Sequence, residues 1–123
     1  MYCSQCGVRL AEKAVERRTR TVCPACGYMV HRQLRVGAAL LVQRDGALLL
    51  VRQRSANGTF PGTWSLPARY SRIDEPPAVT AAREATEETG LQLKIGGLVD
   101  VYYFDDDPPG NGVLLVYEAK IVD

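Results

Sequence analysis

Apolar residues run almost unbroken from Val36 to Arg54, and only the Asp45-Gly46 pair clearly divides them. An Asp-Gly pair between two apolar runs is a strong signal for a two-residue hairpin turn. Strands that are apolar on both faces need cover on both faces, so the pattern predicts two strands of a doubly covered sheet. Residues 55–63, SANGTFPGT, are expected to form a loop because they contain Asn-Gly and Pro-Gly pairs.

A helix is predicted over residues 74–90, DEPPAVTAAREATEETG. Asp74 is expected to cap its N-terminus, and Pro76 or Pro77 suits its first turn. Gly90 is a natural C-terminal stop because glycine adopts the left-handed conformation easily. One side of the helix is small and mostly apolar, which suits close packing on a sheet: Val79, Ala82, Ala85, Thr86 and Thr89.

Further strands are predicted at residues 64–68, where Pro67 cuts the strand short, and at 91–104 and 112–122 around the turn-rich segment DDDPPGNG. The order β-β-β-α-β-β predicts an α/β or α+β domain with a mixed sheet. No apolar run approaches the ~20 residues that span a bilayer, and the N-terminus lacks the features of a signal peptide. We therefore expect a cytoplasmic protein with no membrane partner.

Charge divides the chain unevenly, although the formal net charge is only +1. Residues 1–35 contain seven Lys or Arg against two Glu, a balance of +5, so the remainder carries −4. Such asymmetry is typical of two units with different chemistry. We expect the boundary near Arg35–Val36, giving units of residues 1–35 and 36–123.

All four cysteines lie in the first unit as two C-x-x-C pairs: Cys3, Cys6, Cys23 and Cys26. The spacing fits a four-thiolate zinc site. The alternatives are two disulfides, which a reducing cytosol disfavours, or unrelated free thiols. The unit resembles a zinc ribbon, and its zinc is expected to be structural because four thiolates leave no open coordination position. His31 is a substitute ligand in principle, but we expect it on the surface or in a linker.

Three glutamates fall within roughly one third of the circumference of the predicted helix: Glu84, Glu87 and Glu88. Like charges at this spacing repel and lower helix stability. A solvated helix face is the usual explanation, but these acids lack a basic residue four positions onward, and Glu75 precedes the same helix. The cluster therefore indicates oxygen ligands for Mg²⁺ or Mn²⁺, ions that often share their coordination with substrate phosphates.

The same residues resemble the signature of a known family. The pattern E-x7-R-E-U-x-E-E-x-G-U, where U is apolar, matches Glu75, Arg83, Glu84, Ala85, Glu87, Glu88, Gly90 and Leu91. It is similar to the Nudix box, and the upstream GTWSLP resembles the usual approach to that box. The resemblance covers roughly Val36 to the end and implies a Nudix-type mixed sheet that carries the Nudix helix.

The resemblance also implies an activity, hydrolysis of a nucleoside diphosphate linked to another moiety by a metal-activated water. It assigns the metal site to Glu84, Glu87 and Glu88, with Glu88 or Glu84 as general base. Glu75 is a weaker ligand candidate. Arg83 is expected to orient a glutamate through an ion pair.

Two departures from the family pattern stand out. Ala68 and Arg69 replace the glycines that normally follow Leu-Pro, and Arg72 occupies a position where many members carry an acid. Arg69 is expected either to offer its guanidinium to a phosphate or to obstruct the site. Family members also continue with a strand and a second helix, which residues 36–123 do not supply. We therefore expect a fragment of a longer chain, or cover provided by a partner.

A zinc ribbon ahead of a Nudix domain resembles the NADH pyrophosphatases, but their SQPWPFPxS motif is missing after the box. This favours ADP-ribose or another nucleoside diphosphate derivative over NADH. Arg52 and Arg54 are candidate phosphate contacts, unless they are solvated strand-end residues. Aromatic candidates for stacking on a base are Phe60, Trp64, Tyr102 and Tyr103, although Trp64 is expected in the core.

Two other functions stay open. The basic first unit suits a nucleic-acid-binding or RNA-cap-processing protein, although four thiolates on zinc carry −2 and weaken its field. The Ala68-Arg69 replacement suits a non-catalytic Nudix domain that senses a nucleotide. We expect a small-molecule partner, with nucleic acid disfavoured and a homodimer left open.

Overall fold

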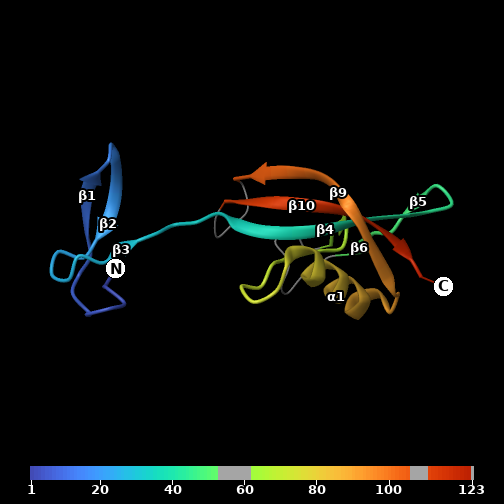
Figure 1. Cartoon of the computed structure of the whole chain (residues 1–123), viewed down its shortest axis with the longest axis horizontal. Coiled ribbons are helices and arrows are strands. Elements are labelled where there is room, and N and C mark those ends of the chain that lie inside the picture. The colour runs from blue at the N-terminus through green and yellow to red at the C-terminus, as the bar shows by residue number, and fades with distance from the viewer. Residues whose placement is uncertain (53–61, 106–110, 123) are drawn as a thin grey trace. The chain divides into compact units, whose positions relative to one another are not determined.

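The apolar run that begins at Val36 forms the central strand β4, Arg35–Arg44, of the computed structural model, which describes residues 1–52, 62–105 and 111–122 (Figure 1). The chain divides into two units, Met1–Gln33 and Leu34–Asp123. The first contains β1 (Ala11–Val15), β2 (Arg18–Val22) and β3 (Met29–Val30). The second contains β4, β5 (Ala47–Leu48), β6 (Val51–Arg52), β7 (Trp64–Ser65), β8 (Ala68–Tyr70), α1 (Pro77–Thr89), β9 (Leu93–Phe104) and β10 (Gly112–Ile121).

The predicted turn at Asp45-Gly46 is confirmed, since φ is 51° at Asp45 and 81° at Gly46. Positive φ at both central residues is the geometry of the two-residue turn that matches strand twist. The prediction of one continuous strand after this turn is wrong. It divides into β5, which pairs with β4, and β6, which pairs with β7 in a separate two-stranded sheet.

Five strands form the mixed sheet, in the order β5-β4-β10-β9, with β8 also paired to β4. β10 runs parallel to β4 and antiparallel to β9, so the predicted mixed sheet is confirmed. Burial follows this order, because β4 is central. Ala38, Ala39, Leu40 and Val42 are buried and Leu41 is half-buried, whereas the two residues of the edge strand β5 are exposed.

The helix α1 lies against one face of this sheet and contacts β4, β8 and β9 (Figure 1). Ala81 and Ala85 pack against Leu40, Val42 and Ala119 in the core. The small side of the helix was therefore predicted in part. Ala85 is buried as expected, but Val79 is exposed, and the fully buried positions also include Thr80 and Ala81.

Both ends of α1 have clear causes. Gly90 ends the helix with φ of 76° and donates its backbone N–H to the Thr86 carbonyl at 2.8 Å, as predicted. The predicted capping role of Asp74 is wrong, because Pro76 is the N-cap residue and no side chain caps the helix. Pro77 then occupies the first turn, where a missing N–H costs nothing. Two consecutive prolines thus place the helix start beyond the reach of Asp74.

In the first unit, β1, β2 and β3 form an antiparallel sheet in that order. Two knuckles with the same hydrogen bonds precede β1 and β3: Gly7 N–H donates to the Cys3 carbonyl and Gly27 N–H to the Cys23 carbonyl. Both glycines have φ near 80°, a conformation that favours glycine. Across residues 1–52, 62–105 and 111–122, α1 is the only helix, and no helix combines the length and apolar character that crossing a membrane requires.

Candidate active site

The glutamates of α1 take part in a network with three arginines. Arg83 donates from Nη1 to Glu84 Oε1 at 3.2 Å and to Glu87 Oε1 at 3.3 Å. Glu87 therefore has a basic partner four positions earlier in the helix, which the expectation of unpartnered acids overlooked. Repulsion within the cluster is offset by these ion pairs.

Arg83 also binds Glu75, the acid that precedes the helix. Its Nη2 donates to Glu75 Oε1 at 3.0 Å and its Nε to Glu75 Oε2 at 3.2 Å, so the contact is a two-pronged fork. Thr80 Oγ1 donates to Glu75 Oε1 at 2.6 Å. Arg83 and then Thr80 hold the pKa of the Glu75 carboxyl at about 2, below its usual 4.5, and the same fork raises the pKa of Arg83. Arg83 thus forms ion pairs with three glutamates, and its orienting role stays a prediction.

Two further guanidinium groups approach the cluster from the segment before the helix. Arg69, on β8, donates from Nη2 and Nε to Glu88 Oε1 at 2.7 and 3.0 Å. Its Nε also lies 3.6 Å from Glu84 Oε2. Arg72 Nη2 lies 4.0 Å from Glu84 Oε1. The structure thus brings Arg69 to the carboxylates themselves.

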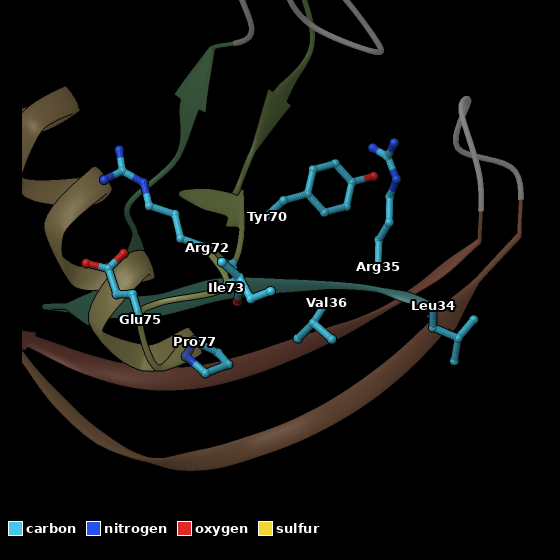
Figure 2. A pocket seen from close by; sticks show the side chains of 9 residues that line it. Leu34, Arg35, Val36, Tyr70, Arg72, Ile73, Glu75 and Pro77 are labelled. Atoms are coloured by element: carbon cyan, nitrogen blue, oxygen red, sulfur yellow. The ribbon is translucent and has the colours of Figure 1, made fainter. Parts of the chain in front are cut away.

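A cavity of about 500 Å³ opens beside this network (Figure 2). Arg72 and Glu75 line the end nearest α1, and Arg35 and Tyr70 line the opposite end. The Arg35 guanidinium carbon lies 5.2 Å from the centroid of the Tyr70 ring, a cation–π contact. The sequence analysis identified neither Arg35 nor Tyr70 as a site residue, because only the pairing of β8 with β4 places them together.

Other expected site residues lie elsewhere. Arg52 is exposed on β6, opposite Trp64 of β7. Trp64 is 63% exposed, so its expected place in the core is wrong; it belongs to the two-stranded sheet rather than the five-stranded one. Tyr102 and Tyr103 have exposed side chains on β9. Arg54 and Phe60 lie outside the described residues.

The four cysteines converge on one point of the first unit. All their Sγ atoms lie within 4.8 Å of one another. Cys3 Sγ lies 3.7 Å from Cys26 Sγ, and Cys6 Sγ lies 3.4 Å from Cys23 Sγ. These separations exceed the ~2.05 Å of a disulfide and approach the ~3.8 Å between ligands of a tetrahedral ion bound at about 2.3 Å. The cysteines can therefore hold a metal ion, and His31, which is exposed, is outside the group.

Backbone N–H groups donate to the cysteine sulfurs and favour their negatively charged thiolate form. The Cys26 N–H donates to Cys23 Sγ, and backbone donors lower the pKa of Cys23 to about 6. The backbone N–H of Val8 favours the Cys6 thiolate, but neighbouring thiols outweigh it and raise the pKa of Cys6 to about 12. Four adjacent sulfurs therefore cannot all ionise unless a cation compensates their charge.

Comparison with known proteins identifies the family. Residues 31–122 match the model of the NUDIX domain. An ADP-ribose pyrophosphatase of Methanocaldococcus jannaschii is 26% identical over 117 residues, covering 94% of this chain and 65% of that protein. A MutT-like protein of Streptomyces ambofaciens is 42% identical over 65 residues, covering 53% of this chain and 39% of that protein. The chain thus spans under two thirds of either relative.

A solved structure gives the same result. The crystal structure of a NUDIX hydrolase from Nitrosomonas europaea superposes with a TM-score of 0.84 at 28% identity, covering 99% of this chain and 68% of that one. The overlap includes the mixed sheet and the helix that carries the glutamates. On the family match, the structural likeness and the carboxylate-bearing helix, the chain belongs to the Nudix hydrolase family.

Proposed function

We propose that the protein is a metal-dependent pyrophosphohydrolase that cleaves a nucleoside diphosphate linked to another moiety. ADP-ribose is the leading candidate substrate, because the relative that matches 94% of the chain is named an ADP-ribose pyrophosphatase. The observation that carries the proposal is the placement of Glu84 and Glu88, whose carboxylates already share one cationic group, the guanidinium of Arg69.

We assign Glu84, Glu87 and Glu88 to a Mg²⁺ or Mn²⁺ site. Their carboxylate oxygens are the donors that these hard cations prefer, and the site accepts positive charge. A divalent ion held by these residues would activate a water and would neutralise charge on the departing phosphate. Glu75 is assigned a positioning role instead of ligation, because Arg83 and Thr80 already engage both of its oxygens.

The remaining chemistry belongs to side chains of this chain. Glu88 or Glu84 accepts the proton of the attacking water as general base. Attack on one phosphorus of the diphosphate breaks the bridging P–O bond and releases two monophosphate-type products. Arg83 orients Glu84 and Glu87 through its two Nη1 hydrogen bonds.

The cavity next to the cluster is our candidate for the group attached to the diphosphate. Arg72 lies at the end nearest the glutamates, where a phosphate would arrive. Tyr70 offers an aromatic ring for stacking, and Ile73, which is fully exposed, offers apolar surface at the rim. Arg52 and Arg54 stay candidates for further phosphate contacts.

In the first unit we propose a structural zinc ion on Cys3, Cys6, Cys23 and Cys26. The sulfur separations and the purely thiolate donor set suit tetrahedral zinc. A unit of this size has little core, so metal binding would provide much of its folding free energy. A reducing cytoplasm suits such thiols, and we propose that location.

A screen of nucleoside diphosphate derivatives tests the enzyme proposal. The protein is incubated with ADP-ribose, NADH and related compounds plus Mg²⁺ or Mn²⁺, and phosphate is measured after phosphatase treatment of the products. We expect metal-dependent turnover of ADP-ribose that Glu88→Gln loses and that Glu118→Gln, a substitution on β10, retains. Equal turnover by wild type and Glu88→Gln would contradict the assignment.

A second candidate, a non-catalytic nucleotide sensor, is favoured by the contact of Arg69 with Glu88. It predicts that ADP-ribose binds in calorimetry while no substrate in the screen is hydrolysed. Binding without turnover, across both metal ions, would replace the enzyme proposal with this one.

A further inference from the structure

Arg69 stands where the Nudix box has glycine, and its guanidinium lies on the carboxylates that we assign to the metal. We infer that Arg69 is a built-in counter-cation: it occupies Glu84 and Glu88 in the metal-free protein, and it transfers to the diphosphate of the substrate when a divalent ion takes its place. The inference rests on the proposed function.

The charges of the cluster call for such a cation. The cluster contains four glutamates, three paired with Arg83 and the fourth, Glu88, paired with Arg69. Arg83 alone would leave these four carboxylates with a balance of −3. Arg69 and Arg72 reduce this balance to −1. A divalent ion in place of Arg69 and Arg72 would give the same balance of −1. A metal ion and the guanidinium groups are therefore alternative ways of neutralising the same carboxylates.

The carboxylates are arranged for arginine in this state. Among residues 1–52, 62–105 and 111–122, only the four cysteines form a group of three or more metal-binding side chains with all ligand atoms within 4.8 Å. The glutamates do not converge in this way. Glu88 Oε1 instead accepts both hydrogen bonds of Arg69, and Glu84 divides its oxygens between Arg69 and Arg83.

Arg69 can leave without a change in the fold. Its backbone is held in β8 opposite Ala38 of β4, while its side chain is 55% exposed. Its partners are less exposed, at 21% for Glu84 and 27% for Glu88, but the arginine end of each contact is open to water, which weakens the ion pairs. The freed guanidinium would stay beside the cluster, and its planar set of donors matches phosphate oxygens.

The test compares wild type with Arg69→Gln, which keeps a long polar side chain and removes the charge. Mn²⁺ binding is measured by calorimetry without nucleotide, and ADP binding is then measured on the Mn²⁺-loaded proteins. Arg69→Gln should bind Mn²⁺ roughly two- to five-fold more tightly, the range expected from an exposed ion pair. It should bind ADP more weakly, because a phosphate contact is lost.

Opposite shifts in the two affinities are the result that supports the exchange. Lys120→Gln removes one exposed charge from β10 of the same unit and should change neither affinity. Arg69→Lys keeps the charge without the planar fork, so its Mn²⁺ affinity should fall between those of wild type and Arg69→Gln. Unchanged thermal melting of the metal-free variants verifies that they fold.

Equal Mn²⁺ affinity in wild type and Arg69→Gln would overturn the inference and leave the proposed function standing. Weaker Mn²⁺ binding by Arg69→Gln, or unchanged ADP binding, would also overturn it. Absence of Mn²⁺ binding to both proteins would overturn the exchange and would contradict the metal site of the proposed function as well.

Discussion

Arg83 holds Glu75 with a two-pronged contact, Nη2 to Oε1 at 3.0 Å and Nε to Oε2 at 3.2 Å. The contact joins the segment before α1 to the middle of that helix. Because the helix has no side-chain cap, this fork and the Thr80 hydroxyl fix the path by which the chain enters it. The position of the loop that carries Arg72 therefore depends on the Glu75 carboxylate.

Replacement of Glu75 by glutamine should lower stability in a pH-dependent way. The pKa of Glu75 is about 2 in the folded protein against a usual 4.5, so its ionised form stabilises the fold above pH 4.5. That contribution fades as the pH falls toward 2. The difference in melting temperature between wild type and Glu75→Gln should be largest above pH 4.5 and shrink below it. Asp74→Asn, which removes a neighbouring acid without a capping role, should show no such trend.

Glu88→Gln should reduce the activity strongly while changing the stability of the metal-free protein only slightly. Loss of a metal ligand or general base should reduce kcat/KM by about 100-fold or more. The metal-free stability should change by only about 0.5 kcal/mol, because relief of repulsion with Glu84 and Glu87 is offset by loss of the Arg69 contact. Added Mg²⁺ should raise the melting temperature of wild type more than that of the variant. An equal Mg²⁺ response in both proteins would show that Glu88 is a solvated helix residue.

Enlargement of Ala85 tests how closely α1 packs on the sheet. Ala85 is 1% exposed and contacts the core around Leu40 and Val42. Ala85→Leu should lower the free energy of unfolding by about 1–3 kcal/mol, the usual cost of overpacking. Val79→Leu, at an exposed position of the same helix, should change it by less than about 0.5 kcal/mol. Equal effects in denaturant unfolding would mean that the helix does not pack tightly here.

Local chemistry made part of the fold predictable. Asp45-Gly46 requires a conformation with positive φ at two successive residues, and Gly90 supplies one at the helix end, so both appear from sequence alone. The Asp74 cap was wrong because the proline pair shifts the helix start, a competition between two local signals. Thus the turn and the helix end, each set by one strong local signal, were predicted correctly, whereas the helix start, where two local signals compete, was not.

The sequence predicts that the glutamates of the candidate site share one helix, but it does not predict their contacts. Fixed spacing places Glu84, Glu87 and Glu88 on one helix, and the spacing is visible in the sequence. The approach of Arg69 to Glu88 joins residues 19 positions apart and depends on β8 packing beside α1. Tyr70 lines the cavity because β8 also pairs with β4, another contact between elements. Contacts between elements need the tertiary structure.

Loss of one of the proposed zinc ligands should destabilise the first unit of the chain and leave the second unit folded. Cys23 is 1% exposed, and its Sγ accepts the Cys26 N–H, so it is central to the sulfur cluster. Cys23→Ser should reduce bound zinc from one ion per chain to near zero and unfold the first unit, because metal binding is expected to provide much of the folding free energy of that unit. His31→Ala should keep its zinc, since the imidazole lies outside the cluster.

The same variant tests whether the first unit matters for catalysis. The glutamate network lies within the second unit, Leu34–Asp123. Cys23→Ser should therefore keep its Mg²⁺-dependent thermal stabilisation and its kcat on soluble protein, while losing solubility. In NMR spectra, the signals of residues 1–33 alone should lose their chemical-shift dispersion. Loss of turnover in a variant whose second unit stays folded and binds Mg²⁺ would mean that the first unit takes part in substrate binding.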